Sequence, residues 1–224
     1  AGRGGGTQVE FQKYLWAFGG DFFDENWKPI FNQEPGIKAL EYHKKLLKYA
    51  PPGATGVGWY ELISGACEGQ AAMVDFWALH WSLWLENPAL MGSKVAGNVI
   101  YSKLPAGTVP GISGISSWGL MIPKVIPDRQ KDAAFQYIAW LTGDEGARKV
   151  GEIGGIVPRI APFKDPGFVA KWPYFPMVLE APKGGKIEAP EIPEWWQVSE
   201  ILAAEVSSAL AGEKTSKKAL DDAA

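Results

Sequence analysis

A predicted helix near the start of the chain ends at two glycines, and this limits the path that the following residues can take. Residues 7–18 have the composition of a helix, and Gly19 and Gly20 follow it directly. Glycine readily adopts the positive φ that ends a helix, so a sharp turn is expected there. Asp21 and Phe22 come immediately after, on backbone that a ligand can approach closely. An acceptor beside aromatic faces predicts a binding wall for a polyhydroxylated solute, and a helix end whose aromatics fill the core is the alternative.

The composition argues against several classes of function. The 22 basic and 25 acidic side chains give a net charge of -3, so the chain has no excess of positive charge that would attract a nucleic acid. No apolar run reaches the roughly 18 residues of a membrane-spanning helix. The single cysteine and two histidines show no zinc-ligand spacing, so neither a metal nor a cofactor is expected. The 11 tryptophans instead favour a site that stacks on flat ligand faces.

The order of elements predicts an α/β fold, because helices and strands alternate. A capping-box pattern, Thr7 with Glu10, is expected to begin the first helix. On the second helix, His43 is expected to face solvent. Helices are predicted at 7–18, 37–49, 59–68, 128–141, 142–154, 195–212 and 216–223, the last capped by Ser216. Buried strands are predicted at 71–74, 99–101 and 119–123.

A second aromatic cluster follows the first predicted strand. Asp75, Trp77, His80 and Trp81 come just after residues 71–74. Open α/β sheets place ligands beyond the carboxyl ends of their strands, so this cluster is a second candidate ligand wall.

Two loops that could carry catalytic motifs lack the residue spacing that those motifs require. The Ser-rich loop 111–116 lacks the G-x-S-x-G elbow, and Gly184-Gly185-Lys186 lacks the remainder of a phosphate loop. No catalytic residue is therefore predicted, and binding without turnover is favoured. Two alternatives stay open: an enzyme acting on glycosides through carboxylates such as Asp21 and Asp24, and an aromatic-rich interaction module.

Five motifs, in this order, carry a resemblance to a known family. They are Gly19-Gly20-Asp21-Phe22-Phe23-Asp24, Gly69-Gln70-Ala71-Ala72-Met73, Trp118-Gly119-Leu120-Met121-Ile122-Pro123, Trp140-Leu141-Thr142-Gly143-Asp144-Glu145-Gly146 and Gly154-Gly155-Ile156-Val157-Pro158-Arg159. The series resembles the family 1 extracellular solute-binding proteins of bacterial ABC transporters, the sugar-binding relatives of maltose-binding protein.

The resemblance implies a class II periplasmic-binding-protein-like α/β fold of two lobes joined by a hinge, here lacking most of the amino-terminal lobe. Residues 1–100 and 157–224 would belong to the carboxyl-terminal lobe, and 101–156 would cross the hinge and join the amino-terminal lobe. The chain would then be a fragment, a cleaved product or one of two chains.

The resemblance also implies a function and a set of site residues. A sugar or polyol would lie between the lobes, and the ABC permease and the missing amino-terminal half would be the protein partners. The location would be periplasmic or extracellular, with or without a lipid anchor. The ligand-binding residues implied are Trp16, Gly20, Asp21, Asp75, Trp77, His80, Trp81, Trp118, Arg159, Trp195 and Trp196.

Overall fold

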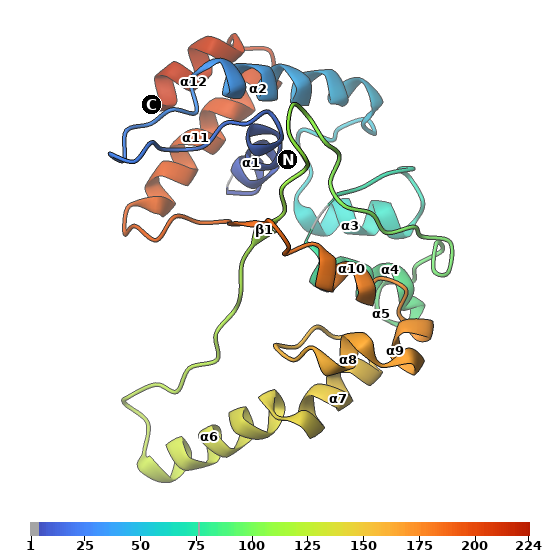
Figure 1. Cartoon of the computed structure of the whole chain (residues 1–224). Coiled ribbons are helices and arrows are strands. Elements are labelled where there is room, and N and C mark those ends of the chain that lie inside the picture. The colour runs from blue at the N-terminus through green and yellow to red at the C-terminus, as the bar shows by residue number, and fades with distance from the viewer. Residues whose placement is uncertain (1–4, 76) are drawn as a thin grey trace. The chain divides into compact units, whose positions relative to one another are not determined.

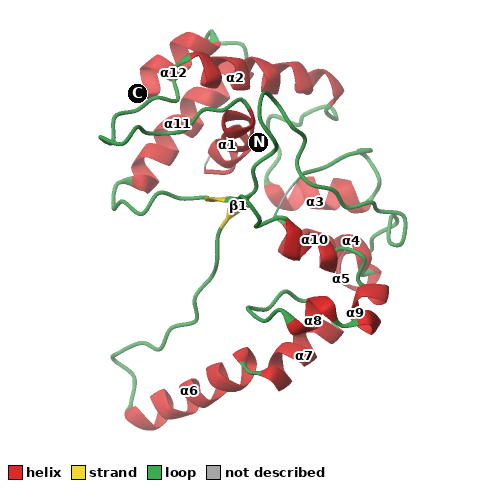
Figure 2. Ribbon diagram, in the orientation of Figure 1, coloured by secondary structure: helices red, strands yellow, loops and turns green. Residues whose placement is uncertain are grey.

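The chain forms two compact units in a computed structural model that describes residues 5–75 and 77–224, without the side chains of residue 5 and of 78–81. The first unit combines Ala1–Asp75, Lys103–Ile115 and Gly184–Ala224, and the second combines Phe76–Ser102 and Ser116–Lys183. Helices dominate both units, and the described residues contain only two short strands (Figure 2).

Four helices build the core of the first unit: α1 (Gly5–Ala17), α2 (Glu34–Leu46), α11 (Trp195–Leu210) and α12 (Ser216–Ala223). The helix α1 packs against both α2 and α11, and α12 packs against α11 and α2 (Figure 1). The aromatic and aliphatic side chains between them are almost fully buried, including Phe11, Leu15, Phe22, Leu40, Leu202 and Val206. A 3-10 turn, Leu47–Tyr49, and the helix α3 (Trp59–Cys67) complete the helical part of this unit.

The first unit also holds a two-stranded parallel sheet beside these helices. Its strands are β1 (Gly114–Ile115) and β2 (Lys186–Ile187), with Gly114 opposite Lys186 and Ile115 opposite Ile187. The Lys186 amide donates to the Ser113 carbonyl at 3.0 Å, so the backbone of β2 is fixed where it carries the Lys186 side chain.

The second unit is a series of mostly short helices. They are α4 (Ala78–Glu86), α5 (Pro88–Met91), α6 (Asp128–Thr142), α7 (Asp144–Glu152), α8 (Ala161–Lys164), α9 (Pro166–Lys171) and α10 (Phe175–Glu180). A cluster around Phe163, Trp172, Tyr174 and Phe175 forms the core of this unit. The longest helix of the unit, α6, contains no buried residue.

The predicted helices are confirmed, with ends shifted by a few residues. The predictions for two helix caps are wrong. The helix α1 begins at Gly5, so Thr7 lies inside the helix and cannot form a capping box at its start. The side chain that caps α12 is Thr215, which accepts from the Lys218 amide at 3.2 Å. Capping patterns can occur at neighbouring positions, and the sequence alone did not fix which one is used.

The three predicted strands are wrong, since residues 71–74, 99–101 and 119–123 are irregular. Many of these residues are exposed, including Met73 at 91% and Ile100 at 93%. A strand needs a neighbouring strand to satisfy its N–H and C=O groups, and none of the described residues supplies one here. The described part of the fold is therefore mostly helical.

The prediction for His43 is also wrong, because its side chain is only 8% exposed. The buried face of α2 consists of Gly36, Ala39, Leu40 and His43, which lie three or four residues apart. The polar type of His43 suggested the surface, whereas its position on this face places it in the interior.

Candidate functional site

The turn after α1 places the first group of candidate residues. Gly19 has a φ of +78°, and its amide donates to the Trp16 carbonyl while the Gly20 amide donates to the Leu15 carbonyl, each at 2.9 Å. This pair of bonds is a Schellman motif, which ends the helix as predicted. Gly20 is needed for a different reason: a Cβ there would lie 2.4 Å from the Leu15 side chain. The turn therefore delivers Asp21 at a fixed position.

The carboxylate of Asp21 is held by three donors. The Phe22 amide donates to its Oδ1 atom at 2.9 Å, and the indole Nε1 of Trp16 donates to the same atom at 3.3 Å. The Nζ of Lys186 donates to Oδ2 at 2.7 Å. The same Nζ lies 5.8 Å from the centre of the Trp16 ring, close enough for a cation–π contact. We call Trp16, Asp21 and Lys186 the Asp21 cluster.

The members of the Asp21 cluster differ in solvent exposure. Trp16 is only 3% exposed, so its ring supports the cluster from within. The side chains of Asp21 and Lys186 are 44% and 40% exposed, so a solute can reach both. The cluster therefore exposes a charged acceptor, Asp21, and a charged donor, Lys186, to solvent, and both contact the buried ring of Trp16.

An open hollow adjoins Asp21 within the first unit. Its lining carries three carboxylates, three aromatic rings and one proline: Asp21, Phe22, Phe23, Asp24, Glu25, Trp27 and Pro190. Trp27 is 57% exposed and has a φ of +60°, unusual for a residue other than glycine. Its ring lies 5.7 Å from that of Phe23. The hollow thus combines aromatic and acidic side chains, and binding of a solute to it stays a prediction.

Asp75 takes part in a second, more buried charge cluster. The ammonium of Lys13 pairs with the carboxylates of both Asp75 and Glu10. Burial alone would lower the pKa of Lys13, but these two negative charges outweigh it and raise that pKa above its usual value. Burial is the main cause that raises the pKa of Glu10. Asp75 therefore already has an internal cationic partner, and solute binding by Asp75 stays a prediction.

The interior beside Lys13 also contains His43. Its ring lies 4.9 Å from that of Tyr14, and its Nδ1 atom has no hydrogen-bond partner among the described residues. Burial, reinforced by the positive charge of Lys13, lowers the pKa of His43 to about 3. His43 is consequently neutral at physiological pH.

The two tryptophans before the last long helix have opposite environments. Trp195 is 6% exposed and belongs to the core, with its ring 5.0 Å from that of Phe22. Trp196 is 76% exposed. Of this predicted pair, Trp196 is the one whose face is open to a solute.

The second unit holds three further candidates. Trp77 is 39% exposed and precedes α4, and Trp118 is 92% exposed. Arg159 donates from Nε to the Thr142 carbonyl at 2.8 Å. The side chains of His80 and Trp81 are outside the described residues. For all of these candidates, as for Asp21, a role in binding stays a prediction.

Sequence reasoning missed Lys186 and Trp27. Lys186 follows Gly184 and Gly185, a spacing that indicates only an incomplete phosphate loop and assigns no role to the lysine. Nothing in the sequence near Lys186 indicated a partner at Asp21, which is 165 residues away. Trp27 lacked a signal because its left-handed backbone belongs to a turn in which the Asp24 amide donates to the Lys28 carbonyl and the Trp27 amide donates to the Asp24 carbonyl.

The described residues contain neither a candidate metal site nor a candidate membrane-spanning helix. No group of three or more His, Cys, Asp or Glu side chains among them is arranged to hold a metal ion. None of the described helices has the length and apolar character needed to cross a membrane.

Comparison with known proteins identifies the class and then the family. The fold is that of the periplasmic sugar-binding proteins: the ribitol complex of an ABC transporter solute-binding protein from Agrobacterium radiobacter K84 matches with a TM-score of 0.87 and 30% identity. That match covers 99% of this chain and 56% of the other. The family described as bacterial extracellular solute-binding protein matches residues 1–148. The chain belongs to this family.

Two further relatives agree on the extent of the match. Maltose-bound MalE3 of T. maritima has a TM-score of 0.88 and 26% identity, over 99% of this chain and 57% of that one. A protein of Sinorhizobium fredii named "Probable amino-acid ABC transporter periplasmic-binding protein y4oP" is 30% identical over 99% of this chain and 49% of its own length. The chain thus spans about half the length of the relatives that it matches, which are binding proteins rather than enzymes.

Proposed function

We propose that the protein carrying this chain is the substrate-binding component of an ABC transporter and binds a neutral sugar or polyol. The observation that carries the proposal is the match to the ribitol-bound protein over 99% of this chain. The Asp21 cluster supports it, because an exposed acceptor and an exposed donor beside aromatic rings suit a solute with many hydroxyl groups.

The binding cleft in this proposal lies between two lobes, and residues 101–156 contribute to the amino-terminal lobe. The support comes from the apolar surface of this segment. Trp118, Met121 and Val125 are 92%, 85% and 92% exposed, and Phe135 on α6 is 65% exposed. Exposed apolar side chains in such number are typical of a surface that another part of a protein covers.

Transport follows from closure of the two lobes. A solute that touches both lobes stabilises the closed form by its higher affinity for that form, and the membrane permease would read the closed form. The family assignment supports a periplasmic or extracellular location, where the solute is captured. A lipid anchor would keep the protein near the permease.

An amino acid is the second candidate solute, because the name of the Sinorhizobium fredii relative specifies one. The two candidates differ in charge: a polyol is neutral, whereas an amino acid carries both an ammonium and a carboxylate group.

A titration of the intact protein carrying this chain tests the proposal. Intrinsic tryptophan fluorescence would be followed during addition of ribitol, mannitol, maltose and leucine, with product analysis of the same samples. We expect a saturable change with at least one sugar or polyol and no product. Saturation with leucine alone would favour the second candidate, released product would indicate an enzyme, and no response to any solute would favour an interaction module.

A further inference from the structure

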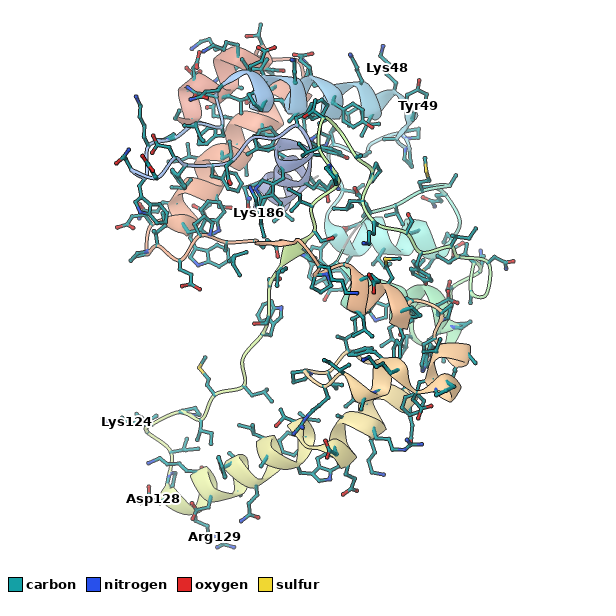
Figure 3. The ribbon with its side chains drawn as sticks, viewed as in Figure 1. Lys48, Tyr49, Lys124, Asp128, Arg129 and Lys186 are labelled. Carbon is teal, nitrogen blue, oxygen red and sulfur yellow. The ribbon has the colours of Figure 1, made fainter. Side chains whose placement is uncertain are left out.

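Lys186 and Asp21 form an exposed pair of opposite charges whose geometry is fixed from both sides. The Nζ of Lys186 lies 2.7 Å from Asp21 Oδ2, and both side chains remain more than one third exposed (Lys186 is labelled in Figure 3). An isolated exposed ion pair contributes little to stability, so stability alone gives a weak reason for this arrangement.

The acceptor side is oriented by two bonds from within the fold. The Phe22 amide and the Trp16 indole both donate to Oδ1 of Asp21. A carboxylate offers about four lone-pair sites, and three are used by Phe22, Trp16 and Lys186. One site is left for a hydroxyl that donates.

The donor side is fixed by β2. The Lys186 and Glu188 amides donate to the Ser113 and Ile115 carbonyls, each at 3.0 Å. Gly185 permits this close approach, because a Cβ there would lie 2.8 Å from both the Ile115 side chain and the Ser113 carbonyl oxygen. The ammonium has three donors and gives one to Asp21, which leaves two for a solute.

We infer that Lys186 and Asp21 bind two neighbouring hydroxyl groups of a neutral polyol, with Lys186 donating to one oxygen and Asp21 accepting from the other hydroxyl. Lys186 is thereby a solute-contacting residue that determines specificity, and the Asp21 carboxylate both accepts from the solute and positions Lys186. This inference rests on the proposed function and adds a residue and a recognition mode to it.

The chemistry of the pair favours a neutral diol over an amino acid. The two charges cancel, so the pair presents no net charge that would attract an ion. A diol uses the remaining sites of both groups while their mutual bond stays intact. An amino acid would bring an ammonium to Asp21 and a carboxylate to Lys186, and these charges would compete with the existing ion pair.

Calorimetric titration of the intact protein carrying this chain with ribitol, mannitol and leucine tests the inference. Lys186→Met removes the ammonium and keeps the apolar stem, and Lys186→Arg keeps the charge. Lys183→Met is the matched control, since Lys183 lies three residues earlier and its ion pair with Glu180 is on the surface. Thermal unfolding of each variant is measured in parallel.

We expect Lys186→Met to weaken binding of the preferred polyol by roughly 10- to 100-fold, as loss of hydrogen bonds from a charged donor would. Lys186→Arg should recover part of the affinity, Lys183→Met should bind like the parent, and all four proteins should unfold within a few degrees of one another. Parent-like polyol affinity in Lys186→Met, or a change in unfolding temperature alone, would overturn the inference and leave the proposed function intact. A parent that binds leucine and no polyol, or no solute at all, would overturn the inference together with the proposed sugar function.

Discussion

Replacing His43 by Phe should reduce the loss of stability that the protein suffers in mild acid. His43 is 8% exposed and its pKa is lowered from 6.5 to about 3, first by burial and then by the nearby charge of Lys13. Phenylalanine preserves an aromatic ring against Tyr14 but cannot take up a proton.

The direction follows from the two pKa values. Between pH 6.5 and about 3 the unfolded chain binds a proton at His43 that the folded chain does not accept. Stability therefore falls as the pH falls through this window, and the contribution of His43 is constant above it. The slope approaches about 1.4 kcal/mol per pH unit, which amounts to roughly 2–3 kcal/mol between pH 6 and pH 4.

Urea denaturation followed by far-ultraviolet circular dichroism at pH 4, 5, 6 and 7 measures the effect. The free energy of unfolding of the parent should fall relative to that of His43→Phe by this amount between pH 6 and pH 4, and by a smaller amount, about 0.7 kcal/mol, from pH 7 to pH 6. Parallel pH profiles for the two proteins would refute the reasoning, because they would mean that the folded protein protonates His43 at an ordinary pKa.

Three further substitutions test separate parts of the structure. Gly19→Ala should lower the free energy of unfolding by about 1 kcal/mol, because the φ of +78° at this turn strains any residue with a Cβ; chemical denaturation checks this value. Trp195→Ala should cost about 3–5 kcal/mol, whereas the exposed Trp196→Ala should stay within about 0.5 kcal/mol, and equal losses would contradict the burial difference. Trp77→Ala should weaken sugar binding by about 1–3 kcal/mol if its ring is a stacking platform, and calorimetry that finds parent-like affinity would assign it to the scaffold.

Helices were predictable from this sequence because their signals are local. The turn after α1 shows this clearly: the glycine pair, the end of the apolar pattern and the following acidic residue all lie within a few positions, and the structure has the expected left-handed φ at Gly19. The family was predictable for a related reason, since its motifs recur in a fixed order along the chain.

Strands were not predictable because their partners are not local. The run at 71–74 is apolar enough for a buried strand, yet a strand forms only beside another strand, and the described residues supply none. The observed strand pair joins Gly114 to Lys186, a pairing that no local pattern indicates.

The candidate site divides in the same way. Trp16 and Asp21 were predicted together because they flank one turn, whereas Lys186 approaches Asp21 from the other end of the chain. His43 shows the opposite error: a polar residue type suggested the surface, while its place on the face of α2 with Leu40 put it in the interior.

Hydrogen exchange of residues 101–156 tests the two-lobe account most directly. The chain would be measured alone and again after the proposed amino-terminal half is supplied as a separate chain, with sugar affinity recorded in both states. Alone, this segment should be the least protected part of the chain, because α6 has no buried residue and its apolar side chains lack a cover. Adding this proposed half should raise both the protection of 101–156 and the affinity for sugar. Protection of 101–156 equal to that of α11 in the isolated, monomeric chain would contradict the account and indicate a self-sufficient domain.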